Sequence, residues 1–276
     1  MIIRRTQFAF SLVELSIVLV ILGLLTGGIL GGQSLIRAAE LRAVSTEYSR
    51  YATAVSAFRD KYFALPGDMS NATAFWGSAH GTAVTCGTTT TNDQRTCNGN
   101  GNGLIDLYDG SYAMSNEYFR FWQHLSNAGM IEGNFSGIEG SLGNVAHGVG
   151  GLNVPRSKLS RAVWYVRDLG TRSGHSELFD GAYGNGFMFG GQSTVGQPGL
   201  FGEHVLKPEE AWNIDTKNDD GMPATGRILP SIRAGCTMYP NGSAMTTDAA
   251  GAAATNATYA LVSSVNVCTL IFRQVM

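Results

Sequence analysis

The longest apolar stretch of the chain lies near its amino terminus. Residues Leu15–Gly32 include no charged residue, and a serine and a threonine carry the only polar side chains there. Because a helix rises about 1.5 Å per residue, the stretch Phe10–Gly32 is long enough to cross a hydrocarbon layer of roughly 30 Å. Arg4 and Arg5 precede it without an acidic residue beside them. The positive-inside rule therefore predicts a single-pass protein whose residues 1–9 stay in the cytoplasm.

A second apolar pattern follows the first with the period of a helix. Its members recur at alternating spacings of three and four, which places them on one helix face. They are Leu41, Val44, Tyr48, Tyr51, Val55, Phe58 and Tyr62. Charged residues, including Glu47, are expected to lie mostly on other faces, and Pro66 ends the pattern. The sequence predicts one helix from Phe10 to about Tyr62, or two helices broken at Gly27-Gly28 or Gly31-Gly32.

The rest of the chain predicts short strands and helices separated by glycine-rich turns. Four segments have the β-branched and aromatic content of strands: Ala162–Val166, Gly186–Phe189, Thr258–Val262 and Val267–Phe272. Helices are predicted at Ser115–Gly129, with Ser115 as N-cap, and at Pro208–Ile214. Residues 68–93 are predicted to be irregular. The expected fold is α+β, with a long N-terminal helix packed on an antiparallel β-sheet in a loop-rich globular domain.

Composition narrows the function classes. Of 276 residues, 36 are glycine and only 14% are charged, and the net charge is −2. These values are typical of an ordered, loop-rich extracytoplasmic protein rather than a disordered one. The chain has no run of five or more Lys or Arg residues. Binding to nucleic acid through phosphate neutralisation is therefore not expected.

One carboxylate interrupts the start of the apolar stretch. A charged group in lipid costs a few kcal/mol unless it is paired, so Glu14 predicts a cationic partner. The sequence from Ala9 and Phe10 through Glu14 resembles the class III signal of type IV pilins and type II secretion pseudopilins. The resemblance implies that a prepilin peptidase cleaves between Ala9 and Phe10 and that Phe10 is then N-methylated. It also implies that Glu14 pairs with the terminal amine of a neighbouring subunit during assembly.

The signal departs from the usual pattern of these families in two ways. Ala9 stands where glycine is usual before the cleavage site, and the helix-loosening proline late in the segment is absent. Instead, Gly23, Gly27 and Gly31 form small-xxx-small spacings, which allow close contact between helices.

The resemblance implies a chain of four segments. Residues 1–9 would be the leader peptide, 10–32 the transmembrane and filament-core helix, 33–65 its amphipathic continuation, and 66–276 the globular extracytoplasmic domain. The expected function is that of a non-enzymatic structural subunit, a minor one, of a type IV pilus or a type II secretion pseudopilus. It would reside in the bacterial inner membrane with a cytoplasmic amino terminus and then join an extracytoplasmic filament. Its partners would be prepilin peptidase and other pilin or pseudopilin subunits.

A different class of function stays open at this level. The chain could be a surface-anchored binding module or enzyme that uses a pilin-type signal only for export. No HExxH, GxSxG or P-loop motif is present to support an enzyme. The expectation is therefore that the protein is not an enzyme.

Four cysteines agree with export to an oxidising compartment. They are Cys86, Cys97, Cys236 and Cys268. Their spacing lacks the C-x₂₋₄-C pattern of zinc sites, so disulfides are expected. Three pairings are possible, and proximity in sequence favours Cys86–Cys97 and Cys236–Cys268.

A glycine- and asparagine-rich segment is similar to the 12-residue calcium loop of EF-hand and dockerin-like modules. Oxygen ligands occur at the positions that such loops use, with the backbone carbonyl of Leu104 at position seven and Gly103 at position six. The predicted ligands are Asn98, Asn100, Asn102, Leu104, Asp106 and Asp109. The first three are neutral, which predicts weak binding of calcium, about 10⁻⁴–10⁻³ M. The alternative is a Gly/Asn turn cluster beside a disulfide.

A second acidic segment contains Asp215, Asp219 and Asp220. Three carboxylates so close together could bind calcium, and major pseudopilins resemble this chain in having a calcium site in their carboxy-terminal region. The favoured interpretation is an Asp-rich turn closed by Gly221.

Overall fold

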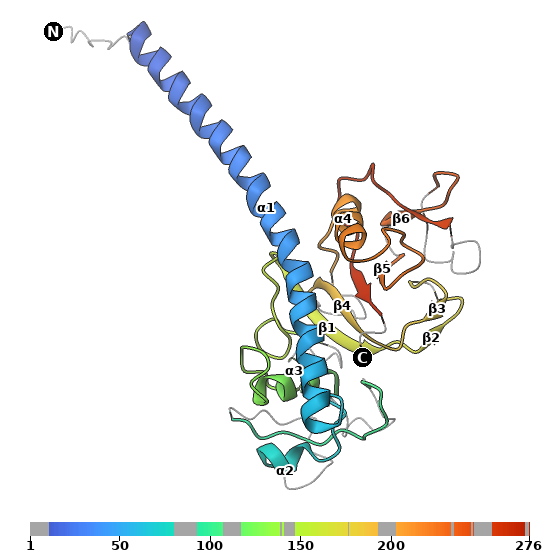
Figure 1. Ribbon diagram of the computed structural model, residues 1–276. Helices are drawn as coiled ribbons and strands as arrows, with labels where there is room; N and C mark the ends of the chain where they lie inside the picture. The colour runs from blue at the N-terminus through green and yellow to red at the C-terminus, as the bar shows by residue number, and fades with distance from the viewer. Residues whose placement is uncertain are drawn as a thin grey trace, which may run out of the picture.

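The computed structural model describes residues 11–79, 93–106, 117–138, 140, 147–175, 177–192, 203–232, 235–243, 245, 256–273 and 276 (Figure 1). Its helices are α1 (Leu12–Tyr62), α2 (Ala72–Trp76), α3 (Glu117–Asn127) and α4 (Pro208–Asn218). Its strands are β1 (Ala162–Asp168), β2 (Thr171–Arg172), β3 (Gly181–Ala182), β4 (Asn185–Gly191), β5 (Ile228–Pro230), β6 (Thr237–Met238), β7 (Thr258–Tyr259) and β8 (Leu270–Phe272).

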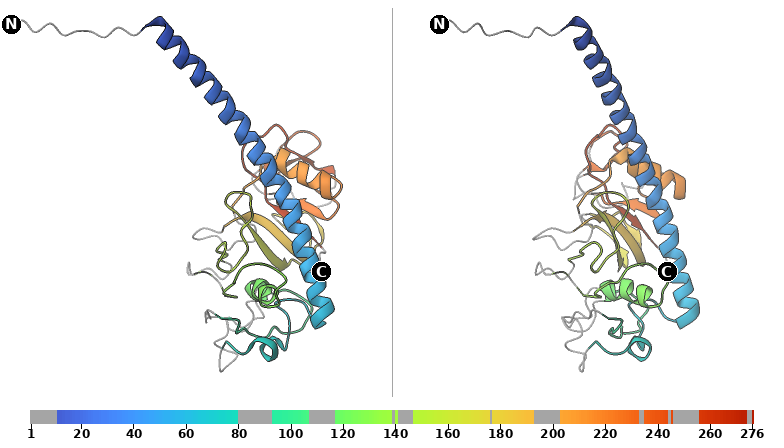
Figure 2. Two further views of the ribbon diagram at one scale, coloured as in Figure 1. Left: turned by 60° about the vertical axis from the view of Figure 1, so that its left-hand side comes forward. Right: turned by 90° about the vertical axis from the view of Figure 1, so that its left-hand side faces the viewer.

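Helix α1 is continuous over 51 residues, which corresponds to about 77 Å. It begins at Ser11, whose hydroxyl accepts a hydrogen bond from the backbone N–H of Val13, and it ends at Phe63 in the left-handed conformation, with φ of 53°. No break occurs at Gly27-Gly28 or Gly31-Gly32, so the single-helix prediction is confirmed and the two-helix alternative is wrong. About half of α1 projects beyond the folded domain, which we call the head, in all three views (Figures 1 and 2).

The main sheet has four antiparallel strands in the order β1-β4-β8-β5. Trp164 of β1 pairs with Phe189 of β4, and Phe187 of β4 pairs with Phe272 of β8. Cross-strand partners share a face of a sheet, so these aromatic residues form one layer. Two small antiparallel pairs, β2-β3 and β6-β7, lie outside this sheet. The predicted α+β fold is confirmed.

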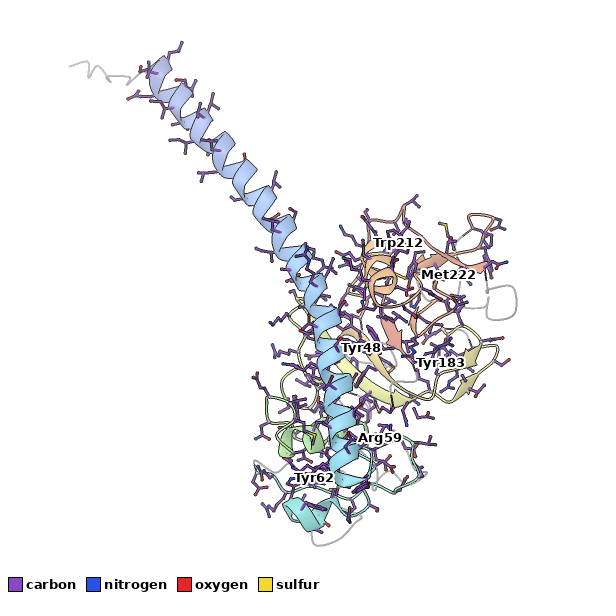
Figure 3. All side chains as sticks on the ribbon, in the orientation of Figure 1. Tyr48, Arg59, Tyr62, Tyr183, Trp212 and Met222 are labelled. Atoms are coloured by element: carbon purple, nitrogen blue, oxygen red, sulfur yellow. A yellow bond between two sulfur atoms is a disulfide. The ribbon has the colours of Figure 1, made fainter. Side chains whose placement is uncertain are left out.

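Helix α1 packs its second half against the aromatic layer of the sheet. The ring of Tyr48 stacks on Phe272 with centroids 4.4 Å apart, and Tyr51 lies edge-on to Trp122 at 5.1 Å and to Trp164 at 5.7 Å. All seven members of the predicted stripe are buried in the core or packed against it. The helical periodicity therefore identified the face of α1 that contacts the head, where Tyr48 and Tyr62 are labelled in Figure 3.

Three local predictions were wrong. The segment predicted to be irregular contains the short helix α2. Glu47 is buried rather than solvated, because its carboxylate accepts hydrogen bonds from the indole N–H of Trp164 and the backbone N–H of Lys158, both at 2.8 Å. The strand predicted at Thr258–Val262 ends at Tyr259, and the residues that follow form an exposed turn.

Helices α3 and α4 occupy their predicted segments. The predicted N-cap Ser115 lies outside the described residues, and α3 is described from Glu117. Gly129 follows α3 with φ of 71°, a left-handed conformation that glycine adopts without strain at a helix end. Helix α4 extends to Asn218, one turn beyond its predicted end. Strands β2, β3, β5 and β6 were not predicted.

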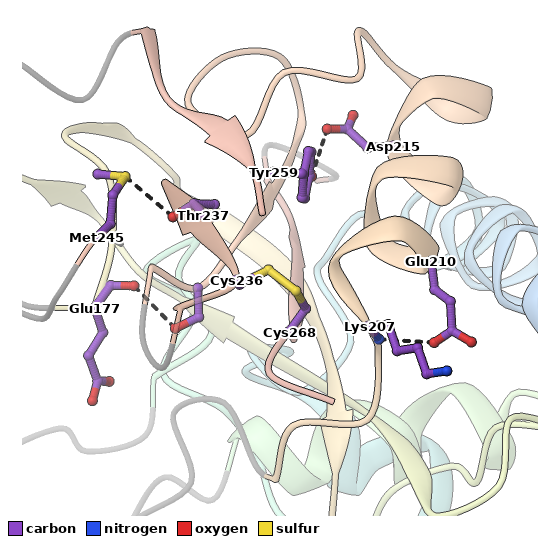
Figure 4. Close-up of a disulfide and its surroundings, with 10 residues drawn as sticks. Glu177, Lys207, Glu210, Asp215, Cys236, Thr237, Met245, Tyr259 and Cys268 are labelled. Atoms are coloured by element: carbon purple, nitrogen blue, oxygen red, sulfur yellow. Dashed lines mark hydrogen bonds between the residues drawn. A yellow bond between two sulfur atoms is a disulfide. The ribbon is translucent and has the colours of Figure 1, made fainter. Parts of the chain in front are cut away.

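A disulfide joins Cys236 to Cys268, with Cα atoms 5.1 Å apart (Figure 4). It ties the segment before β6 to the segment before β8. Cys97 is also disulfide-bonded, while its predicted partner Cys86 lies outside the described residues.

Candidate functional site

The projecting half of α1 presents apolar side chains to every side. The exposed fractions there are large, from 50% at Ile21 to 83% at Leu12, and no residue of the most apolar 18-residue window is buried. The mean hydropathy of this window is 2.4. By length and composition, α1 is the one helix among the described residues that could cross a membrane. Figure 3 shows its side chains pointing outward, away from the side chains that the figure draws on the head.

The glycines of this half lie on an open helix surface. A Cβ atom added at Gly23, Gly27 or Gly31 would meet no atom within 4 Å, and the same is true at Gly28 and Gly32. No packing among the described residues therefore requires glycine at these five positions. Small residues at such spacings let a second helix approach closely, so the surface suits helix–helix contact between subunits.

Glu14 is engaged at the start of α1 within its own chain. Its Oε2 accepts a hydrogen bond of 2.9 Å from the backbone N–H of Ser11, while the Ser11 hydroxyl accepts from Val13 N–H at 3.3 Å. This reciprocal arrangement is a capping box. The positive end of the helix dipole also favours a carboxylate there. The carboxylate consequently lies beside the amino end of the helix, while Ala9 and Phe10 lie outside the described residues.

An ion pair joins α1 to the head where the apolar half ends. Arg37 Nε and Nη2 donate to the two carboxylate oxygens of Glu210 on α4, both at 2.6 Å, and Nη2 also donates to the backbone oxygen of Val205 at 3.1 Å. The neighbouring carboxylate raises the pKa of Arg37, and Arg37 in turn lowers the pKa of Glu210 against the opposing effect of burial. Sequence reasoning missed this pair because its members are far apart in the chain.

The predicted calcium loop is organised around a buried carboxylate that sequence reasoning missed. Asp68 Oδ1 accepts hydrogen bonds from the backbone N–H groups of Gly101 and Asn102, and Oδ2 accepts from Gly103, at 2.6 to 3.0 Å. Burial raises the pKa of Asp68, and these three N–H groups oppose the rise. The loop backbone is therefore held by the protein itself.

A second buried carboxylate contacts the same loop at two backbone positions. Glu117, the first described residue of α3, accepts hydrogen bonds from the backbone N–H groups of Asn100 at 2.9 Å and Asp106 at 3.0 Å. Burial raises the pKa of Glu117 to about 7. The acidic residue that begins the predicted helix was the available sequence signal, but only the fold places it under the loop.

The predicted calcium ligands separate into two groups. The side-chain amides of Asn100 and Asn102 contact Asp106 Oδ2, at 3.4 and 2.8 Å, so these three side chains converge. Asn98 Oδ1 instead accepts from the backbone N–H of Thr73, next to α2. Asp109 lies outside the described residues. The geometry thus brings these three side chains together through the amide nitrogens, whereas the amide oxygens of Asn100 and Asn102 accept from the next backbone N–H groups of the loop, and Asn98 is directed elsewhere.

Carboxylate oxygens of Asp215, Asp219 and Asp220 lie within 4.8 Å of one another. Each accepts hydrogen bonds from the protein. Asp215 accepts from the hydroxyl of Tyr259 at 2.8 Å (Figure 4), Asp219 from the backbone N–H of Ile228 in β5, and Asp220 from the backbone N–H of Met222 and the hydroxyl of Thr225. Burial raises the pKa of Asp215 to about 7. These contacts are those of an Asp-rich turn, the interpretation that the sequence favoured.

Comparison with known proteins identifies the amino-terminal segment. Residues 4–30 match the family described as the prokaryotic N-terminal methylation motif. This part of the chain is the class III signal of type IV pilins and pseudopilins, and the motif implies processing by prepilin peptidase and assembly with other pilin subunits. No curated protein and no solved structure in the comparison matches the chain.

Proposed function

We propose that this protein is a minor structural subunit of a type IV pilus or a type II secretion pseudopilus and not an enzyme. The observation that carries the proposal is the bare apolar half of α1, which coincides with the methylation motif at residues 4–30. Apolar surface on all sides of a helix must be covered by lipid or by other helices. A filament subunit uses both, first in the membrane and then in the filament core. The large head favours a minor subunit.

The mechanism of assembly is mechanical. The subunit resides in the inner membrane with its amino terminus in the cytoplasm, is cleaved before Phe10 and is methylated there. Its apolar helix then enters the filament, where Glu14 pairs with the terminal amine of a neighbour. The capping geometry supports this role, because Ser11 N–H keeps the carboxylate at the end of the helix where such an amine would arrive.

Glu14→Gln tests the proposal, because glutamine removes the charge but can still form a capping box with Ser11. We expect the variant to enter the inner membrane at the normal level and to be lost from sheared filaments. Glu14→Ala removes charge and cap together, and should be lost equally. Ser16→Ala is the matched control, since its hydroxyl donates only to the backbone oxygen of Val13.

Mass spectrometry of the mature chain separates processing from assembly. Every variant should carry N-methyl-Phe10. If Glu14→Gln is processed and still enters filaments normally, the charge has no role in assembly and the proposal is wrong. That result would favour the export-only alternative, a surface-anchored binding module or enzyme.

We also propose that calcium binds weakly to the loop of Asn100, Asn102 and Asp106. The convergence of these side chains supports the proposal. Addition of calcium at about ten times its Kd should stabilise the head by about 1.4 kcal/mol. Thermal unfolding at increasing calcium measures this, with Asp106→Asn expected to lose the shift and Asp219→Asn expected to keep it. A shift lost only in Asp219→Asn would place calcium at the other acidic segment.

A further inference from the structure

The head carries an uncharged, apolar surface loop at residues 261–267. Its exposed fractions are 50% at Leu261, 91% at Val262 and 62% at Val265. The other residues of the loop are two serines, an asparagine and a valine. Removing apolar surface from water is favourable, and these exposed side chains do not gain that stabilisation in the isolated subunit.

The loop is anchored at both ends. At its start, the backbone N–H of Ala260 donates to Cys236 O at 3.0 Å, and Ser263 N–H closes a turn onto Ala260 O at 2.9 Å. At its end, Val267 N–H donates to Leu206 O at 3.0 Å, and the next residue, Cys268, forms the disulfide to Cys236 (Figure 4). The valines are therefore presented by a fixed scaffold.

A series of hydrogen bonds links the end of the loop to the point on α1 where the apolar half ends. Arg37 is the first charged residue after Glu14 along α1, and its Nη2 donates to Val205 O at 3.1 Å. Val205 N–H in turn donates to the oxygen of Cys268 at 3.2 Å. The end of the loop thus lies two hydrogen bonds from Arg37. The loop belongs to the side of the head from which the bare half of α1 projects, between β7 and β8 in red beside α4 (Figures 1 and 2).

We propose that the 261–267 loop rests in the interfacial region of the bilayer that α1 spans, so that the head docks on lipid while the subunit waits in the membrane. The inference rests on the proposed function, since it requires α1 to span a bilayer. The occupant is lipid because the end of the loop is linked through Val205 to Arg37, next to which Leu35 and Ile36 of α1 are 73% and 63% exposed. The absence of charge in the loop suits an apolar boundary.

Tryptophan fluorescence of the full-length protein in vesicles tests the loop directly. The vesicles contain phosphatidylethanolamine and phosphatidylglycerol, with or without brominated acyl chains that quench tryptophan at the boundary. Val262→Trp should show emission at shorter wavelength than a tryptophan in water and should lose emission in brominated vesicles. Phe63→Trp is the matched control, because Phe63 is 93% exposed at the opposite end of α1. Its signal should be the same in both vesicles, and wild-type protein provides the background of the native tryptophans.

The outcomes distinguish the loop from the membrane span. If the protein floats with the vesicles and Val262→Trp behaves like Phe63→Trp, the loop does not touch lipid and the inference is wrong, while the proposed function stands. If neither variant floats, α1 does not anchor the chain and both proposals fail. If Val262→Trp is shielded only when subunits associate, a second copy covers the loop and the lipid contact is wrong.

Discussion

The two halves of α1 belong to one unbroken helix but have opposite surroundings. In the first half, apolar side chains lie on all sides of the helix and are exposed, Leu22 for example by 51%. In the second half, Phe58 is fully buried against the head. The first half is apolar around its whole circumference, and the second is apolar along one stripe. An all-round apolar helix requires a surrounding apolar medium, whereas a single stripe requires one packing partner. The first half therefore has no packing partner among the described residues, whereas the second half is part of the core of the head.

The largest difference in stability is expected between two variants, each of which truncates one apolar side chain in a different half of α1. Phe58→Ala should lower the free energy of unfolding of the head by about 3–5 kcal/mol, because it leaves a cavity in the core. Leu22→Ala should leave it unchanged, because Leu22 is 51% exposed and lies outside the core that the described residues form. Urea unfolding of the full chain in detergent, followed by fluorescence of the buried tryptophans, measures both. Equal losses in the two variants would contradict the division of α1.

An intermediate effect, on the pH dependence of stability, is expected from a histidine that packs against the second half of α1. The His124 ring lies parallel to that of Phe58 with centroids 6.4 Å apart, and its Nδ1 accepts from Gly67 N–H at 2.9 Å. Burial, with a contribution from the charge of Arg120, lowers the pKa of His124 to about 3. The unfolded chain takes up a proton below about pH 6.5 and the folded chain does not, so stability falls as pH falls through this window.

Between pH 7 and pH 5 this difference amounts to about 2 kcal/mol. His124→Asn keeps an acceptor for Gly67 but has no titrating group, so its stability should depend less on pH by this amount. Urea unfolding at a series of pH values compares the two proteins. Parallel pH profiles for wild type and variant would mean that His124 is not the titrating group.

The smallest change in the stability of the head is expected from a substitution at the boundary between the two halves of α1. Arg37→Ala removes the ion pair with Glu210, which is partly exposed to solvent on the arginine side. We expect a loss of about 1–2 kcal/mol in head stability, between the values for exposed and buried pairs. Arg42→Ala, at an exposed position one turn further along α1, is the control and should have almost no effect. Similar losses in the two variants would show that the pair does not fasten α1 to the head.

Much of the fold could be predicted from local sequence. The helical stripe, strands β1, β4 and β8, and helix α4 follow from periodicity and composition, because each depends on neighbours a few residues away. Short strands such as β5 (Ile228–Pro230) could not be predicted, because three residues carry too little periodicity. Glu47 was misplaced for a different reason: its partners, Trp164 and Lys158, come from a distant part of the chain.

The residues of the candidate site also divide into those that local sequence indicated and those that it missed. Glu14 and the apolar half were identified from sequence, because their meaning depends on a charge within a continuous apolar run. Asp68 and Glu117 were missed, since a carboxylate that accepts backbone N–H groups from a loop has no local signature. Asn100, Asn102 and Asp106 lie together and Asn98 contacts Thr73 instead, and the predicted calcium loop stays a prediction.

The sequence by itself determined the two ends of the helical pattern, the side of its second half that is buried, and the match of its first half to a methylation motif, whereas the continuity of α1 across its glycine pairs came from the structure. Helical hydrogen bonds and hydrophobic periodicity depend on residues a few positions apart, so they can be predicted from the amino-acid sequence. The tertiary structure alone decided how α4 meets Arg37, which carboxylates lie under the asparagine-rich loop, and where the 261–267 loop stands relative to α1. These features join residues far apart in the chain, and only packing brings such residues together.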